Sequence, residues 1–326
     1  MSTLKDVADR SGVTITTVSR MLNNRGYISA KTKKTIQQAM KELNYQPNEF
    51  ARSLSKKNST FIGLIVPSAS NMFFSKIIDC TERHAQENGY KLLLCTSNHE
   101  EKKEIEYFNM LRANKVAGII LASHTGFLDA QIPDDASVIS FDHTVSAKIP
   151  TICSDNYQGG IIAAQYLIKR GCRKLAHISG SAKLNSFANL RYTGFKDVCE
   201  KEGIPHIVVD ASEELFISMK YEGTINSLLD NNPETDGIFA SNDIIAAKVI
   251  TACKKRNIRV PEQMKVIGYD DIDLCTLFTP SITTIHQPIE EICSQAVKNV
   301  ILFCENKIVP TNITLPVTLI ERESTK

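Results

Sequence analysis

Apolar positions in the first 45 residues recur every three or four residues in three short stretches, which is the spacing of an α-helix. Each stretch follows a hydroxyl side chain of the type that caps helix N-termini: Thr3, Thr14 and Ser29. The apolar faces consist of Leu4, Val7 and Ala8, then Val18, Met21 and Leu22, and then Ile36, Met40 and Leu43. The pattern therefore predicts three helices within residues 1–47.

The second of these helices opens with small hydroxyl residues and an arginine, and a turn containing Gly12 separates it from the first. Two short helices joined by such a turn match a helix-turn-helix, whose second helix enters the DNA major groove. A generic three-helix bundle with a solvated, lysine-rich face is the alternative. The geometry favours DNA binding over that alternative.

From Phe61 onward, apolar runs of strand length alternate with amphipathic helical stretches. The predicted strands are Phe61–Val66, Lys91–Cys95, Ala117–Ala122, Val138–Phe141, Leu175–Ile178, Ile207–Val209, Gly237–Ala240 and Val266–Tyr269. This alternation predicts an α/β fold with parallel sheets covered on both faces, and the two groups of four strands predict two similar lobes. A crevice between such lobes, at the carboxyl ends of the strands, is where a small ligand binds.

Length and composition limit the class of protein. A chain of 326 residues is long enough for two average domains and a small appendage, and 42% hydrophobic residues exclude a disordered chain. No apolar stretch is long enough to span a membrane. Because the N-terminus lacks the apolar core of a secretory signal, we expect a cytoplasmic protein.

The net charge of +2 hides an uneven distribution. Residues 1–58 carry eleven Lys and Arg against four Asp and Glu, a net charge of +7, whereas the remainder carries a net charge of −5. A polyanionic partner would therefore bind the head.

Motifs for metal binding or catalysis are missing from the sequence. The nine cysteines occur singly, so we expect reduced, apolar side chains and no metal or cofactor. The seven histidines, which show no metal-site spacing, are expected on the surface or in loops. A Rossmann dehydrogenase is the main enzyme alternative, but the stretch Phe61–Pro67 lacks the GxGxxG turn and Gly159-Gly160 lacks its full spacing.

Six short motifs stand at fixed spacings in the head. They are Thr3–Ala8, Ser11–Val13, Thr17–Arg20, Leu22-Asn23, Asn44–Asn48 and Ala51–Leu54. They resemble the signature of the lactose/galactose repressor family, and the likeness continues to the C-terminus, where it is closest to sugar repressors of the sucrose-operon type. The resemblance implies a body with the fold of periplasmic sugar-binding proteins. It also implies a sugar-responsive repressor of a carbohydrate-utilisation operon, which is not an enzyme.

The resemblance assigns roles in DNA binding to residues of the head. Ile15, Thr16 and Arg20 would read base edges, because an arginine suits a bidentate contact with guanine. Backbone phosphates would be held by Thr17, Ser19, Asn23, Ser29 and Thr32. Residues 48–59 would form a hinge helix that enters the minor groove of DNA with its partner in a homodimer. Its expected contact residues are Asn48, Ala51 and Leu54, and this segment is too short to be a stable helix alone.

In the body, the resemblance places the effector site in the cleft. The expected effector-binding residues are Phe73, Asp142, Arg191, Phe216, Asn242, Asp270 and Gln287. The body would span residues 60–326, with one lobe formed by about 60–156 and 288–326 and the other by about 157–287. An aspartate after a strand can also cap the following helix, and Arg191 can also be a structural ion pair.

These expectations describe a homodimer that binds double-stranded operator DNA and leaves it when a small sugar closes the cleft. Within the same family, a purine-responsive or phosphocarrier-responsive regulator is the nearest alternative. A secreted sugar-binding transport protein would share the body, but the basic head and the missing secretory signal disfavour it.

Overall fold

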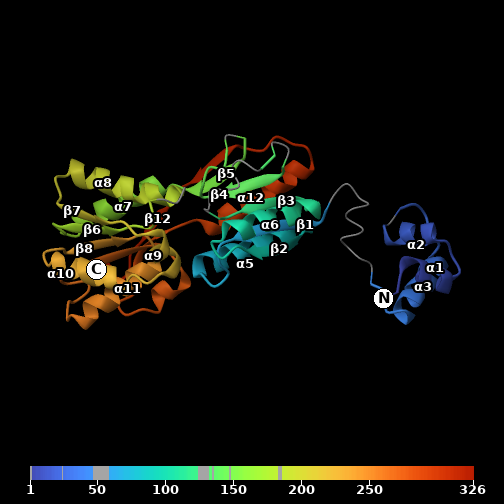
Figure 1. Ribbon diagram of the computed structural model, residues 1–326, viewed down its shortest axis with the longest axis horizontal. Helices are drawn as coiled ribbons and strands as arrows, with labels where there is room; N and C mark the ends of the chain where they lie inside the picture. Colours follow the sequence, from blue (N-terminus) through green and yellow to red (C-terminus); the bar gives the residue numbers. More distant parts are fainter. Residues whose placement is uncertain are drawn as a thin grey trace. The chain divides into compact units, whose positions relative to one another are not determined.

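A computed structural model describes residues 2–23, 25–46, 59–123, 132–133, 136–146, 148–182 and 186–326. The chain divides into two compact units, a head over Met1–Ser59 and a body over Thr60–Lys326 (Figure 1). No helix within these described ranges is long and apolar enough to cross a membrane.

Three helices form the head: α1 (Leu4–Ser11), α2 (Ile15–Leu22) and α3 (Ala30–Glu42). Each begins at the predicted cap, since the side chains of Thr3, Thr14 and Ser29 accept hydrogen bonds from backbone amides in the first turns. Their apolar faces meet in a small core around Val18 and Ile36. The local sequence pattern therefore predicts this unit well.

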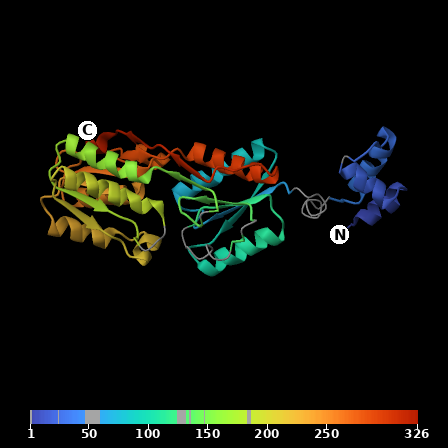
Figure 2. The same ribbon diagram turned by 90° about the horizontal axis from the view of Figure 1, so that it is seen from above.

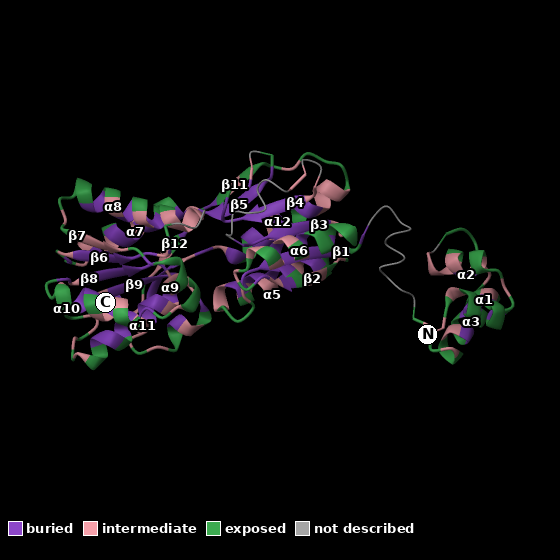
Figure 3. Ribbon diagram, viewed as in Figure 1, coloured by how far each residue is buried: buried purple, intermediate pink, exposed green. Residues whose placement is uncertain are grey.

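The first lobe of the body is built on a parallel sheet with the strand order β11-β5-β4-β3-β1-β2. Its strands are β1 (Phe61–Val66), β2 (Lys91–Thr96), β3 (Gly118–Leu121), β4 (Val138–Phe141), β5 (Thr151–Ser154) and β11 (Asn312–Leu315). Helices α5 (Met72–Glu87) and α12 (Ile289–Cys304) pack on one face, and α6 (Glu101–Ala113) packs on the other (Figure 2). Strands β1, β3, β4 and β5 are buried throughout, as expected for a covered parallel sheet, whereas the edge strands β2 and β11 are partly exposed (Figure 3).

The second lobe repeats this arrangement with the strand order β12-β10-β9-β8-β6-β7. Its strands are β6 (Leu175–Ile178), β7 (His206–Val209), β8 (Gly237–Ala240), β9 (Lys265–Asp270), β10 (Thr283–His286) and β12 (Thr318–Ile320). One face is covered by α7 (Asn156–Lys169) and α8 (Leu190–Lys201), the other by α10 (Glu222–Asn231) and α11 (Asp243–Lys255). The short helix α9 (Glu213–Ser218) lies beside the cleft.

The chain passes between the two sheets three times: after β5, after β10 and after β11. The third passage corrects the expected lobe boundary. β11 ends at Leu315, directly before Pro316, and β12 then pairs antiparallel with β10 of the second lobe. Assigning all of 288–326 to the first lobe is therefore wrong for the residues from Thr318 onward.

One histidine differs from expectation. The sequence predicts surface or loop positions, and His143 lies in the loop after β4, but His177 is buried within a strand. His177 lies in β6, where its Nδ1 donates to the Phe239 carbonyl at 2.9 Å and its ring stacks on Phe239. All nine cysteines are free thiols, and eight of them are buried. Among the residues that the structure describes, no group of His, Cys, Asp and Glu is arranged to hold a metal ion.

Candidate functional site

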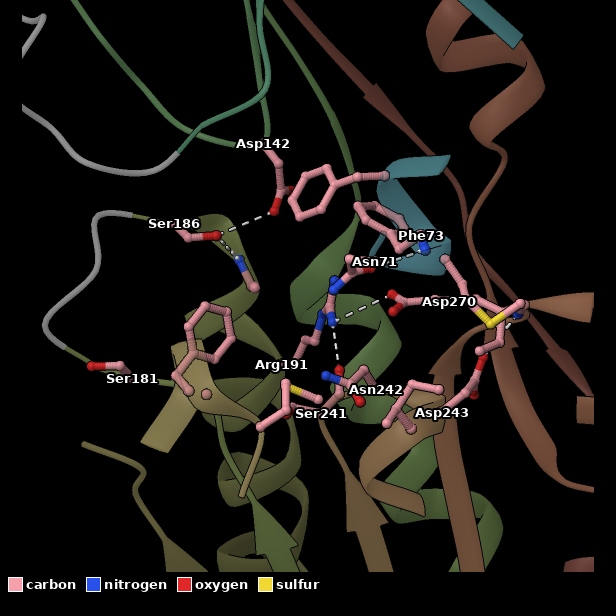
Figure 4. A pocket seen from close by; sticks show the side chains of 18 of the residues that line it. Asn71, Phe73, Asp142, Ser181, Ser186, Arg191, Ser241, Asn242, Asp243 and Asp270 are labelled. Carbon is pink, nitrogen blue, oxygen red and sulfur yellow. Dashed lines mark hydrogen bonds and ion pairs between the residues drawn. The ribbon is translucent and has the colours of Figure 1, made fainter. Parts of the chain in front are cut away.

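A cavity opens between the two lobes at the carboxyl ends of their strands. Its wall combines the start of α5, the ends of β4 and β9, the start of α8, helix α9 and the start of α11 (Figure 4). Six of the seven predicted effector residues line it: Phe73, Asp142, Arg191, Phe216, Asn242 and Asp270. The structure thus brings these side chains together at one site.

Asp142 contributes the first lobe's carboxylate. Its Oδ1 accepts a hydrogen bond from Asn156 Nδ2 at 2.9 Å, and its Oδ2 accepts one from Ser186 Oγ at 3.2 Å. The backbone amide of Phe187 also donates to the Asp142 carbonyl at 3.0 Å. Because the three donors lie on the second-lobe side, Asp142 joins the lobes. Burial raises the pKa of its carboxyl group, and the Arg191 charge opposes that rise.

Arg191 lies at the centre of the site and is only 6% exposed. Its guanidinium carbon lies 3.6 Å from the centre of the Tyr269 ring, a cation–π contact. Its Nε donates to Asn156 Oδ1 at 2.7 Å, and its Nη1 donates to the Ser241 carbonyl at 2.6 Å. The same Nη1 lies 3.7 Å from Asp270 Oδ1. These contacts hold the guanidinium in one orientation at the cavity wall.

Asp270 is the last residue of β9 and supplies the second carboxylate. Burial raises the pKa of its carboxyl group well above the usual value for aspartate, whereas Arg191 acts to lower it. The backbone at Asp142, Asp270 and Asp271 has positive φ angles of 59°, 104° and 55°. Such backbone strain is concentrated at functional sites, where it aims side chains that regular strands would direct elsewhere.

Asn242 has two tasks. Its Oδ1 accepts from the Ile245 amide at 2.9 Å and caps α11, which leaves the Nδ2 group for the cavity.

Phe73 and Phe216 supply aromatic surface from opposite lobes. The Phe73 ring stacks on Phe141 at a centroid distance of 6.1 Å, and Phe216 lies over Gly180.

Gln287 differs from the other six because it does not line the cavity. It is 1% exposed and lies in the second passage between the lobes, where its amide bonds to Ser154 and Asp270. The resemblance predicts that Gln287 contacts the effector directly. In the structure, Gln287 instead contacts Asp270, which is a residue of the cavity wall.

Three further polar residues were not predicted to contribute to the site. Ser181 and Ser241 line the cavity and are buried, yet their hydroxyl oxygens have no hydrogen-bond partner among the residues that the structure describes. Asn156 bridges Asp142 and Arg191 with its amide. The only sequence signal for Asn156 is its place beside the predicted passage between lobes, and nothing in the sequence marks the two serines.

A second cavity continues from the first and shares seven lining residues with it, including Met72, Phe216 and Asn242. Its further lining residues include Ser68, Asn98 and His99 of the first lobe. The cleft is therefore longer than the cavity around Arg191 alone.

In the head, the three predicted base-reading residues Ile15, Thr16 and Arg20 are exposed on α2. Ile15 retains 46% exposure, which is unusual for an isoleucine and leaves its side chain free for an apolar contact. Arg20 folds back so that its Nε donates to the Arg25 carbonyl at 3.3 Å.

The five predicted phosphate-binding residues are partly exposed and engaged in local bonds. The Thr17 amide donates to the Thr14 hydroxyl, Asn23 Nδ2 donates to the Ser19 carbonyl, and the Ser29 and Thr32 hydroxyls are paired. Thr17, Ser29 and Thr32 lie at the starts of α2 and α3, where backbone amides also favour anions, whereas Ser19 and Asn23 lie toward the C-terminal end of α2. The predicted hinge contacts Asn48, Ala51 and Leu54 lie outside the described residues.

The fold and the site define a class of protein: a three-helix DNA-binding head carried by a two-lobed body with the periplasmic-binding-protein-like fold. Residues 3–48 match the model for bacterial regulatory proteins of the lacI family, and residues 164–325 match the periplasmic binding protein-like domain. The chain belongs to the lacI family of bacterial regulatory proteins. Its members are DNA-binding transcriptional regulators rather than enzymes.

Individual relatives match nearly the whole chain. The sucrose operon repressor of Streptococcus mutans is 40% identical over 98% of both chains. The ribose operon repressor of Halalkalibacterium halodurans is 36% identical over all of this chain and 98% of its own. The lac repressor dimer, solved with operator and the anti-inducer ONPF, has a TM-score of 0.83 at 26% identity, with 99% of both chains covered.

Proposed function

We propose that the chain is a homodimeric repressor that binds the operator of a carbohydrate-utilisation operon and leaves it when a neutral sugar closes the cleft. The observation that carries this proposal is the cavity wall. It sets the carboxylates of Asp142 and Asp270 and the residue Ser241 around Arg191, with Ser181 at the edge of the cavity. These carboxyl groups, and the two serine hydroxyls that have no partner among the described residues, call for a ligand with several polar groups, because an unpaired buried polar group costs free energy.

A neutral polyol fits these groups better than an anion. Sugar hydroxyls donate to carboxylates and accept from a guanidinium, so one ligand satisfies both kinds of group. Asp142, Asp243 and Asp270 all contribute to the wall, against the single guanidinium of Arg191. An anionic ligand would meet this excess of acidic groups. Phe73 and Phe216 offer apolar faces for a sugar ring.

Sucrose is the effector that we favour. The continuous second cavity leaves room for a second ring, with Ser68, Asn98 and His99 as its additional polar lining. The Streptococcus mutans relative is a sucrose operon repressor, which agrees with this choice. Ribose is the second candidate, because the Halalkalibacterium relative is a ribose operon repressor and a single ring would occupy the cavity around Arg191.

The homodimer is supported by the edge of the first sheet. Strand β2 pairs only with β1 in the described sheet, and Leu94 on this edge is 43% exposed. An apolar edge strand of this kind invites a partner. A symmetric dimer would present two heads to a palindromic operator.

In the proposed mechanism, sugar binding changes the angle between the lobes and separates the two hinge segments, residues 48–59, of the dimer. Hinge helices that are marginal in isolation then melt, and operator affinity falls. DNA binding and sugar binding are therefore coupled through the body.

The proposal is tested by screening the full chain against sucrose, fructose, ribose and hypoxanthine. Thermal melting identifies the ligand that binds, and fluorescence anisotropy with a palindrome selected by the protein from random DNA measures release. We expect sucrose to raise the melting temperature and to weaken DNA binding. Tighter DNA binding with hypoxanthine would favour the purine-responsive alternative, and a response to none of the four would contradict the proposed effector class.

A further inference from the structure

One buried side chain, Gln287, connects the two main passages between the lobes to the cavity. Its Oε1 accepts a hydrogen bond from Ser154 Oγ at 2.6 Å, and its Nε2 donates to Asp270 Oδ1 at 2.7 Å. Ser154 ends β5, directly before the first passage, and Gln287 follows β10 at the second. All three side chains are buried. In this orientation the Gln287 amide donates to the Asp270 carboxyl group and accepts from the Ser154 hydroxyl, so both of its polar ends are paired.

This chain of bonds continues into the effector cavity. Asp270 lines the cavity and lies 3.7 Å from Arg191 Nη1, whereas Gln287 does not reach the cavity surface. A ligand that shifts the Asp270 carboxyl group therefore changes the hydrogen bond of Gln287 without contacting Gln287 itself. Since a buried amide that loses a partner costs free energy, Gln287 and Ser154 must move together with Asp270.

The position of these bonds allows them to influence the relative rotation of the two lobes. Relative rotation of two lobes is absorbed at the few residues where the chain passes between them. Gln287 and Ser154 occupy two of those points, and their mutual bond makes the two passages respond as one. Hydrogen-bond networks that can adopt two arrangements carry coupling between a binding site and a distant site.

We propose that Gln287 is a positioning residue that transmits effector binding at Asp270 to the relative rotation of the lobes through its bond to Ser154. The inference rests on the proposed function, since it takes an effector in the cavity to control operator binding. Its consequence is specific: removing the Gln287 bonds lowers the coupling between effector and operator while the effector still binds.

The test measures coupling separately from affinity. Gln287→Met keeps the length of the side chain and removes both hydrogen bonds. Operator affinity is measured by anisotropy with and without the sugar to which the wild type responds most strongly. We expect the ratio of the two affinities to fall about tenfold relative to the wild type, which is roughly the value of one buried hydrogen bond. Sugar affinity of the DNA-free protein should change less than about threefold, which is within the spread of a neutral buried contact.

Thermodynamic linkage supplies an internal check. The factor by which sugar weakens operator binding must equal the factor by which operator weakens sugar binding. A merely structural defect would change the melting temperature or the sugar affinity and leave this factor at its wild-type value. Gln287→Met with wild-type coupling overturns the inference.

Ser154→Ala keeps the test decisive if Gln287→Met does not fold. It removes only the bond between the two passages, and we expect the same loss of coupling to a smaller extent. Ser140→Ala is the matched control, because Ser140 is equally buried in neighbouring β4 and its hydroxyl bonds to the His143 carbonyl. Wild-type coupling in Ser154→Ala, or an equal loss in Ser140→Ala, would contradict the inference.

These outcomes separate the two proposals. If none of the sugars in the panel makes the wild type release DNA, the proposed function fails, and this inference fails with it. If the wild type responds and both variants respond equally well, the proposed function stands and only the role of Gln287 is wrong.

Discussion

Gly160 of α7 lies so close to Arg191 of α8 that a β-carbon at position 160 would collide with the Arg191 carbonyl oxygen. A second glycine, Gly194 of α8, lies equally close to the backbone of Tyr157 in α7. The two helices therefore pack backbone to backbone. This approach places the Arg191 guanidinium within reach of Asn156 at the start of α7.

Gly160→Ala should therefore impair sugar binding from outside the cavity. The added methyl group must push α8 away and displace Arg191, at a cost of about 1–3 kcal/mol in the free energy of unfolding. Gly223→Ala in α10 is the matched control, because its β-carbon would meet no neighbouring atom. That control should be neutral or stabilising by up to about 1 kcal/mol. Urea unfolding and sugar titration of both variants check this, and equal behaviour would refute the packing argument.

Arg191→Ala should abolish the sugar response and destabilise the body. Removing the Arg191 side chain leaves the buried Asn156 Oδ1 and the Ser241 carbonyl without their donor, and each unpaired buried group costs about 1–3 kcal/mol. Arg256→Ala breaks the more exposed pair with Asp230 and should cost less than about 1 kcal/mol. Chemical unfolding at pH 7 compares the two. A normal sugar response in Arg191→Ala would contradict the assignment of the cavity as the effector site.

Stability should fall in mild acid because of His177. Burial lowers the pKa of His177 to about 3, so the folded chain keeps this ring neutral while the unfolded chain protonates it near pH 6.5. The stabilisation is complete above pH 6.5. It is lost as the pH falls toward 3, at about 1.4 kcal/mol per pH unit.

His177→Gln removes this dependence and keeps a hydrogen-bond donor for the Phe239 carbonyl. The variant should be less stable than the wild type at pH 7, and its deficit should shrink by about 2 kcal/mol between pH 6.5 and pH 5. Urea unfolding at the two pH values measures both proteins. A deficit that stays constant with pH would show that His177 titrates alike in the folded and unfolded chains.

Leu54→Ala tests the hinge implied by the family resemblance. Loss of an apolar wedge in the minor groove should weaken operator binding roughly tenfold or more. Fewer protein–DNA contacts then offset the free energy that unstacking and bending the DNA cost. Sugar affinity should stay at the wild-type value. Anisotropy with operator DNA and calorimetry with sugar separate these effects, and unchanged operator affinity would remove Leu54 from the interface.

Operator binding should depend steeply on salt, whereas sugar binding should not. Neutralising several phosphates with the basic head releases counterions, and affinity should fall by roughly 10³-fold between 50 and 200 mM salt. A neutral sugar displaces no counterions, so its affinity in the same buffers serves as the control. A salt-independent operator affinity would contradict DNA binding through the head.

The sequence by itself determined the elements that depend on neighbouring residues. The caps Thr3, Thr14 and Ser29 and the buried strands were predictable, because helix starts and covered parallel strands are set by local side chains and local periodicity. The residues around the cavity were named only through the resemblance of motifs to a known family.

Only the tertiary structure decided how those residues work together. Asp142, Asn156, Arg191 and Asp270 come from four separate elements, and their bonds depend on how β4, α7, α8 and β9 meet. The same holds for Gln287. The sequence predicted that it contacts the effector, whereas in the fold it lies behind Asp270 and does not line the cavity. Hydrogen bonds between residues far apart along the chain act over about 3 Å. Their partners are therefore selected by packing in three dimensions, which local sequence patterns do not encode.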